Sequence, residues 1–199
     1  MLGSTFQGNR VRLEGMKYFF HDFETGGFEN TSILTFYGAT TDSQFNITGE
    51  VEFFIRPENG VYHVEAQALM VNKINIVDHY VKSEDKSTCN RKIRDFIMKA
   101  TSFGTSKLTS AGHNVYFDNG LLKNHFFTDY NDFFYRHNLD TGSLALLLKH
   151  IGRLPDDFQI SLVNLANHYG IDATGAHESK TDTLMTIAVL KCMMSEIKV

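Results

Sequence analysis

The first third of the chain consists of short apolar and aromatic runs separated by polar or glycine-containing turns. Residues 17–23 form a run that is rich in aromatic side chains and too short for a core helix, and the turn at 25–27 ends it. Runs at 31–40 and 44–56 carry β-branched and aromatic residues on either side of a polar turn. This pattern predicts three consecutive strands in meander order.

Helical periodicity is more common in the rest of the chain. Four apolar residues fall at i, i+3, i+4 and i+7 within 90–103, which predicts an amphipathic helix that Gly104 ends. A strand over 108–116 is expected to lead directly into another helix. Further helices are predicted near 66–70, over 143–150, between a Ser161 cap and Gly170, and over 180–195. This order of elements predicts an α/β fold with a mixed central sheet.

Composition places these elements in one domain. With 199 residues and 42% hydrophobic content, the chain can bury a full core over 17–199, and 1–16 is interpreted as a flexible leader or an expression-derived extension. The net charge of −4 argues against a generally basic nucleic-acid coat. Two widely spaced cysteines and the lack of a long apolar run predict a soluble, intracellular, cytoplasmic protein without a membrane partner.

The first candidate chemistry lies at the end of the first predicted strand. Asp22 and Glu24 are two positions apart, so an extended strand turns both side chains to one face and the rings of His21 and Phe23 to the other. Two carboxylates in one dry patch repel each other unless a cation or a proton lies between them. Hard oxygen ligands favour Mg²⁺ or Mn²⁺.

Two more acids are predicted near helix beginnings. Asp118 follows a strand and lies just inside a helix, where Asn114 would share its face if the helix begins early or would cap the helix. Near the C-terminus, His177 precedes Asp182 by five residues, which is not a same-face helical spacing. We therefore expect His177 on a loop and Asp182 in the first turn, an arrangement that suits a general base beside a fixed acid.

Together these stretches resemble the three motifs of the DnaQ-like 3′→5′ exonucleases of the DEDDh type, in the same order. The resemblance runs from about residue 17 to the C-terminus. It implies an RNase H-like fold, a mixed central β-sheet flanked by α-helices. It also implies that four acids hold two divalent cations, Mg²⁺ or Mn²⁺, with His177 as the general base (the acids are Asp22, Glu24, Asp118 and Asp182).

The resemblance further implies hydrolysis of phosphodiester bonds from a free 3′ end, with release of nucleoside 5′-monophosphates. Asp22 is the candidate to bridge the two ions, and activity is expected to rise into the alkaline range. Thr25 and the backbone around Gly26 are expected to contact the terminal nucleotide, and Asn114 and Phe23 are further substrate-binding candidates. The chain has Gly26 where the family often has a second threonine, which could alter how the terminal sugar is held.

Several alternatives stay open at this stage. Single-stranded DNA is favoured as the substrate over RNA by analogy with stand-alone exonucleases. The alternative is an exoribonuclease that acts on short RNA. A non-catalytic nucleic-acid-binding module would have the same fold, although all five catalytic candidates are present. An Fe(II) triad of His63, Glu65 and His113 is a third interpretation. A polymerase or replication partner and a homodimer are compatible with the sequence.

Overall fold

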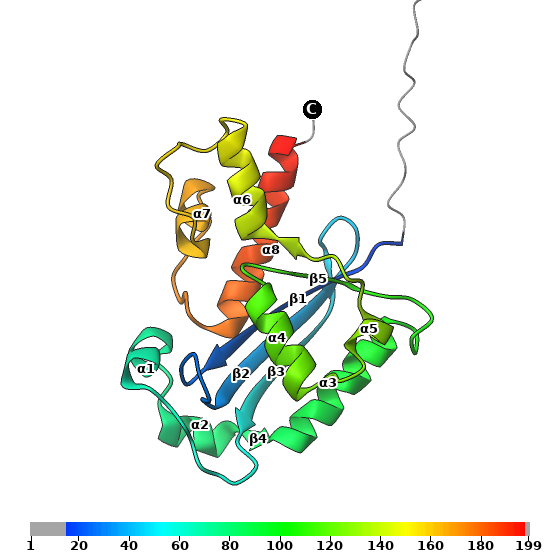
Figure 1. The fold of residues 1–199 in the computed structure, drawn as a ribbon, viewed down its shortest axis with the longest axis vertical. Coiled ribbons are helices and arrows are strands. Elements are labelled where there is room, and N and C mark those ends of the chain that lie inside the picture. The colour runs from blue at the N-terminus through cyan, green and yellow to red at the C-terminus, as the bar shows by residue number, and fades with distance from the viewer. Residues whose placement is uncertain (1–14, 198–199) are drawn as a thin grey trace, which may run out of the picture.

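The computed structural model describes residues 15–197, so the predicted leader at 1–16 lies outside the described residues except for its last two positions. The centre is a six-stranded sheet in the order β4-β3-β2-β1-β5-β6 (Figure 1). The strands are β1 (Tyr18–Thr25), β2 (Ile33–Thr41), β3 (Ile47–Arg56), β4 (Glu84–Asp85), β5 (Thr109–Gly112) and β6 (Leu139–Asp140). The first three form the predicted antiparallel meander, and β5 runs parallel to β1. The predicted mixed sheet is confirmed.

Eight helices in the described residues surround this sheet. They are α1 (Ala66–Asn72), α2 (Ile76–Lys82), α3 (Lys86–Ala100), α4 (Tyr116–His125), α5 (Tyr130–Phe133), α6 (Thr141–His150), α7 (Leu162–His168) and α8 (Ser179–Ile197). The Ser161 side chain caps α7, as predicted, by accepting the amide hydrogen bond of Asn164. The helix predicted at 90–103 begins earlier because Asp85 caps it, and it ends at Ala100, before Gly104. The helices α2 and α5 were not predicted.

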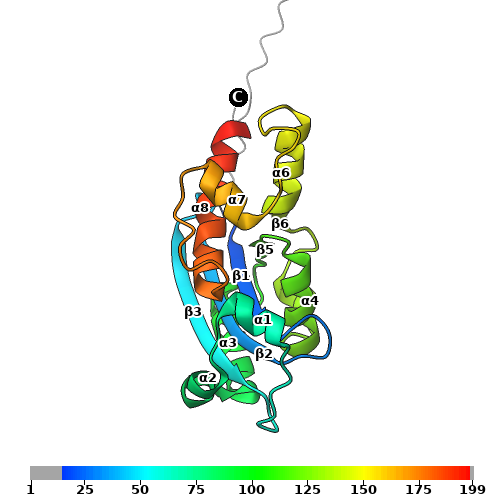
Figure 2. The same ribbon diagram turned by 90° about the vertical axis from the view of Figure 1, so that its left-hand side faces the viewer.

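The alternation of side chains along β1 decides which layer covers each face of the sheet. Tyr18 and Phe20 pack with Ile187 and Leu190 of α8 on one face. Phe19 and Phe23 lie on the other face, in a core cluster with residues of α3 and α4. Figure 2 shows α8 and α4 on different sides of the strands. By the same alternation, Asp22 and Glu24 continue the row of Tyr18 and Phe20 and point towards the α8 side.

The beginning of α8 is held against the sheet. The hydroxyl groups of Ser179 and Thr35 lie 3.1 Å apart and are buried, which joins the first turn of α8 to β2. Further along, α8 packs with α6 and α7 in a separate apolar cluster that contains Leu148, Leu165 and Val189. This packing brings the N-terminal turn of α8 to the end of β1 at which the acids lie. No helix within residues 15–197 is long and apolar enough to cross a membrane.

Candidate active site

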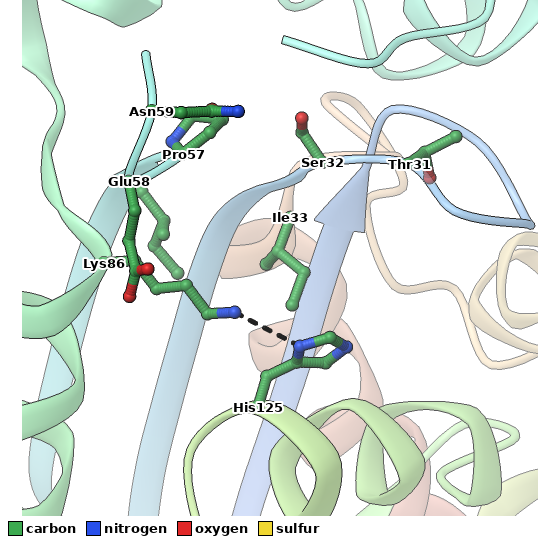
Figure 3. A pocket seen from close by; sticks show the side chains of 9 residues that line it. Thr31, Ser32, Ile33, Pro57, Glu58, Asn59, Lys86 and His125 are labelled. Atoms are coloured by element: carbon green, nitrogen blue, oxygen red, sulfur yellow. Dashed lines mark hydrogen bonds between the residues drawn. The ribbon is translucent and has the colours of Figure 1, made fainter. Parts of the chain in front are cut away.

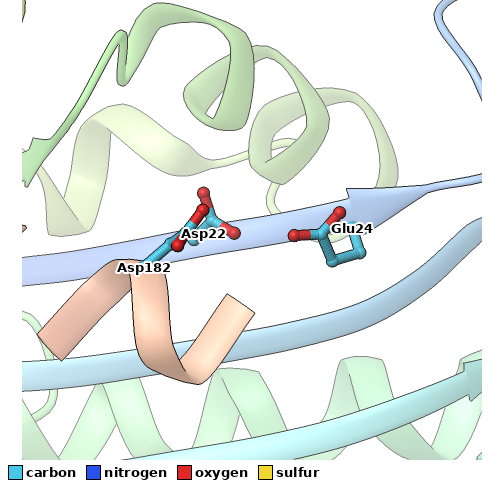
Figure 4. Close-up of side chains that lie close together, drawn as sticks. All are labelled: Asp22, Glu24 and Asp182. Atoms are coloured by element: carbon cyan, nitrogen blue, oxygen red, sulfur yellow. The ribbon is translucent and has the colours of Figure 1, made fainter. Parts of the chain in front are cut away.

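Three carboxylates from two elements meet beside the end of β1. One oxygen each of Asp22, Glu24 and Asp182 lies within 4.8 Å of the others, and no other group of three or more His, Cys, Asp or Glu residues within 15–197 is this close. Figure 4 shows Asp22 and Glu24 on the strand and Asp182 on the first turn of α8. Three hard oxygen donors at this spacing fit a divalent cation such as Mg²⁺ or Mn²⁺.

Asp118 completes the acidic region from the other side of the strand. Its carboxylate is buried, 5% exposed, and its Oδ1 accepts a hydrogen bond of 3.0 Å from the backbone N–H of Phe23, between the two acids of β1. It lies in the first turn of α4, as predicted. Asp118 is not within the 4.8 Å group, so the structure brings three of the four predicted acids together and places the fourth next to them.

Burial raises the pKa of all four predicted metal ligands, and repulsion from neighbouring carboxylates adds to each shift. Burial, followed by repulsion from Asp118, Glu24 and Asp182, raises the pKa of Asp22 well above its usual range. The same two causes raise the pKa of Glu24 to about 8. Burial raises the pKa of Asp118 to about 7, although the Phe23 N–H opposes the shift, and burial raises that of Asp182. With a pKa of about 8, Glu24 therefore holds a proton at neutral pH unless a cation takes its place.

His177 lies on the loop before α8, as predicted. It has a left-handed backbone with φ of 73°, and its backbone N–H donates to Oδ1 of Asp182 over 3.2 Å. The residue is exposed, and it lines a cavity of about 390 Å³ together with Glu24. The loop therefore places His177 beside the acids through its main chain and leaves the imidazole accessible to a substrate.

Asn72 is a site residue that the sequence did not indicate. Its buried side chain donates to the carbonyl of Thr25 over 3.1 Å and accepts the N–H of Ile74 over 3.1 Å. A hydrogen bond from Asn72 also acts on Glu24 and opposes the rise of its pKa. A single asparagine at the end of a short helix carries no sequence signal, because its role comes from the approach of α1 to the end of β1.

Gly26 occupies a place where the chain has no room for a side chain. An added Cβ would lie 2.6 Å from the carbonyl oxygen of His63 and 2.8 Å from Cγ1 of Val64. Two backbone hydrogen bonds hold Gly26 in place. Its N–H donates to the carbonyl of Ser32 over 2.8 Å, and its carbonyl accepts the N–H of Glu65 over 2.6 Å. This close approach is the physical reason for glycine at the position where the family often has threonine.

We expect Gly26→Ala to lower the free energy of unfolding by about 1–3 kcal/mol, because the new methyl group must displace backbone of the 63–64 segment. Urea unfolding followed by circular dichroism measures the change. Gly120→Ala in α4 is the matched control, since its Cβ would have nothing within 4 Å and alanine favours a helix. An unchanged midpoint for Gly26→Ala would show that the 63–64 segment yields freely.

Asp140, at the end of β6, fixes the turn that carries Asn114. Its Oδ2 accepts the N–H of Val115 over 2.9 Å, and its Oδ1 caps α6 through the N–H of Ser143 over 2.8 Å. An acid directly before a helix is a capping signal that sequence could have provided. Asn114 itself is exposed and has φ of 54°. It lies two residues before Tyr116, the first residue of α4. The interpretation that Asn114 shares a helical face with Asp118 or caps the helix is therefore wrong.

Burial and position decide between two further pairs of alternatives. The ring of Phe23 is 5% exposed and packs 4.6 Å from Phe36 and 5.6 Å from Phe126, so it belongs to the core and only its backbone faces the site. The Fe(II) triad is not assembled in the described residues, where the acidic group of β1 and α8 is the sole candidate metal cluster. His113, one of its members, instead lies 2.9 Å from the hydroxyl of Thr141.

A second cavity, of about 310 Å³, lies near the β1–β2 connection but contains none of the acids (Figure 3). Its lining includes Thr31, Ser32 and His125, and the ring of His125 lies 3.2 Å from the Lys86 ammonium. The cavity that contains Glu24 and His177 is therefore the one associated with the candidate chemistry.

Comparison with known proteins identifies related sequences for most of the chain. The exonuclease family model RNase_T matches residues 19–190. Exodeoxyribonuclease I of Escherichia coli (strain K12) is 26% identical over 193 residues, which cover 87% of this chain and 39% of the relative. The chain thus spans well under half the length of this relative.

Solved structures show the same fold. Exonuclease I of E. coli in complex with a dA16 oligonucleotide superposes with a TM-score of 0.75 at 21% identity, over 90% of this chain and 41% of that one. The zinc-bound form of the E. coli enzyme in complex with single-stranded DNA gives a TM-score of 0.72 at 22% identity, with the same coverage. These likenesses confirm the predicted RNase H-like exonuclease fold.

Proposed function

The chain belongs to the RNase_T exonuclease family, and from this premise we propose that it hydrolyses phosphodiester bonds of single-stranded DNA from the 3′ end, releasing nucleoside 5′-monophosphates. The observation that carries the proposal is the meeting of Asp22, Glu24 and Asp182 within 4.8 Å in this fold. DNA is supported by the relative, an exodeoxyribonuclease, and by the oligonucleotide complex of the similar structure. The domain is proposed to extend over residues 17–199.

We assign the metal site to the four acids, with Asp22, Glu24 and Asp182 as direct ligands and Asp118 beside them. Two divalent ions, Mg²⁺ or Mn²⁺, would lower the pKa of an attacking water and stabilise the departing 3′ oxygen. The raised pKa values fit this assignment, because cations would relieve the repulsion that now favours protons. Asn72 holds the Thr25 carbonyl and Glu24 in place for the terminal nucleotide.

His177 is proposed to accept the proton of the attacking water. The hydrogen bond from its backbone to Asp182 keeps the exposed imidazole beside the acids, within the cavity that includes Glu24. Thr25 and the backbone at Gly26 are proposed to contact the terminal sugar, and Asn114 lies on the exposed turn before Asp118. The predicted polymerase or replication partner and the predicted homodimer stay predictions.

We expect His177→Ala to lower kcat by about 10²–10⁴-fold, the usual contribution of general acid–base catalysis, and to weaken the rise of activity towards alkaline pH at a saturating concentration of Mg²⁺. Steady-state rates between pH 6 and 9 measure both effects. His137→Ala, another exposed histidine, should leave rate and profile unchanged. A flat wild-type profile together with a nearly normal His177→Ala rate would contradict the general-base assignment.

The activity itself is tested with 5′-labelled single-stranded DNA and RNA of the same sequence, incubated with Mg²⁺, Mn²⁺ or EDTA and resolved on a gel. The proposal predicts a metal-dependent ladder that shortens DNA from the 3′ end. Faster shortening of RNA would identify an exoribonuclease instead. No shortening of either strand with any metal ion would reject the enzyme and favour a binding module.

A further inference from the structure

A lysine and a histidine face each other in the cavity beside the β1–β2 connection. The half-buried ammonium of Lys86, the first residue of α3, lies 3.2 Å from Nδ1 of His125, the last residue of α4 (Figure 3). It also lies 5.9 Å from the ring centroid of Phe126, which helps to fix its position. No carboxylate oxygen of residues 15–197 comes within 4.0 Å of this ammonium, although Glu58 lines the same cavity.

The contact between the two side chains decides what they offer to a ligand. An ammonium group only donates hydrogen bonds, so Nδ1 must accept, and His125 must be neutral with its proton on Nε2. Partial burial and then the charge of Lys86 lower the pKa of His125, which agrees with a neutral ring. The pair therefore offers N–H donors and one positive charge that no carboxylate balances, and these are the groups that bind an anion.

This cavity adjoins the end of the strand that carries the first two acids. Its lining residue Ser32 accepts the N–H of Gly26 at its carbonyl over 2.8 Å, and Gly26 follows Glu24 by two residues. The neighbouring lining residue, Thr31, donates its hydroxyl to the carbonyl of Gly27 over 2.7 Å. The connection is thus closed on itself, and a chain of nucleotides that leaves the acidic site across it reaches the cavity directly.

We propose that Lys86 and His125 bind a backbone phosphate of the substrate strand, upstream of the nucleotide that occupies the acidic site. This inference rests on the proposed function and adds a contact that holds the strand while its 3′ end is cleaved. The chain has a net charge of −4 and a cluster of acids at its site, so most of its surroundings repel phosphates. A cation without a counter-ion beside the site offsets this repulsion. A free phosphate has the same chemistry, and the experiments below separate the two sources.

Fluorescence anisotropy of a labelled ten-nucleotide DNA strand tests the contact over a range of salt concentrations, with Ca²⁺ in place of Mg²⁺ to limit cleavage. Lys86→Gln should raise Kd about threefold to tenfold at low salt and lower the slope of log Kd against log salt by about 0.7, as expected for one lost phosphate contact on a single strand. Lys86→Arg keeps the charge and should keep the slope. Lys99→Gln, exposed at the other end of α3, is the matched control and should change neither value.

The remaining acid of the cavity provides a test of sign. Glu58 is exposed, and its charge opposes a phosphate bound beside Lys86. Glu58→Gln should therefore lower Kd, whereas His125→Gln should raise it because the ring donor is lost. A Kd that rises in Glu58→Gln would contradict an anion in this cavity.

A strand with one uncharged methylphosphonate linkage locates the phosphate. At one linkage upstream of the 3′ nucleotide, the substitution should raise the Kd of the wild type as much as Lys86→Gln does, and the two changes together should not add. The imidazole NMR signals of His125 should shift when the strand is added, and less so in Lys86→Gln. A shift with inorganic phosphate but none with the strand would assign the site to free phosphate and overturn the strand contact.

Binding and cleavage are scored separately. An unchanged Kd and salt slope in Lys86→Gln, or a wild type that does not bind the strand, overturns the inference. Normal cleavage in Mg²⁺ with an unchanged slope refutes the phosphate contact alone. Binding that depends on Lys86 without any cleavage refutes the proposed function alone.

Discussion

Asp22→Asn is expected to abolish nuclease activity, with a loss of at least about a thousandfold, while it makes the metal-free protein more stable. Burial and the nearby charges of Asp118, Glu24 and Asp182 all raise the pKa of Asp22. To fold at neutral pH, the chain must bury this charge or take up a proton. Asparagine removes that requirement, and we expect a gain of about 1–3 kcal/mol in the free energy of unfolding.

Gel assays of 3′ shortening and urea unfolding in EDTA measure the two effects on one preparation. Asp132→Asn is the control, since this exposed acid of α5 lies away from the cluster and should change neither activity nor stability. A substitution that lowers activity but raises stability is typical at a residue that is kept for function rather than for folding. Retention of more than a tenth of the activity would contradict the role of Asp22 as a metal ligand.

The stability of the metal-free protein is expected to fall by about 1–3 kcal/mol between pH 7 and pH 8.5. The pKa of Glu24 in the folded protein is about 8 and that of Asp118 about 7, well above the values of exposed carboxyl groups. In this window the folded state therefore holds protons that the unfolded chain has lost. The free energy of unfolding must then decrease as pH rises, until the folded carboxyl groups also lose their protons.

Between pH 7 and pH 8.5, the change in the free energy of unfolding comes from these acids and not from the buried His21. Burial lowers the pKa of His21 to about 4, so its protonation in the unfolded chain affects stability mainly below about pH 6.5. Millimolar Mg²⁺ or Mn²⁺ should raise Tm more at pH 8.5 than at pH 7, because fewer protons then compete for the carboxylates. EDTA should reverse this gain and stop cleavage. An equal Tm with and without metal at pH 8.5 would argue against a cation at these acids.

The sequence alone determined the features that depend on local periodicity. A strand alternates its side chains, so the spacing of Asp22 and Glu24 was sufficient to place both on one face. Capping and spacing likewise predicted α7 after Ser161, Asp118 in the first turn of α4, Asp182 in the first turn of α8, and His177 on the loop before it. These predictions succeeded because each depends on neighbours within a few residues.

The tertiary structure decided what these residues meet. Only the packing of α8 on β1 and β2 brings Asp182 to within 4.8 Å of Asp22 and Glu24, across about 160 residues of chain. The approach of α1 to the end of β1 gave Asn72 its role, and the contact with the 63–64 segment explains Gly26. Long-range contacts of this kind leave no periodic signal in the sequence, because they depend on the relative positions of elements that are each locally stable.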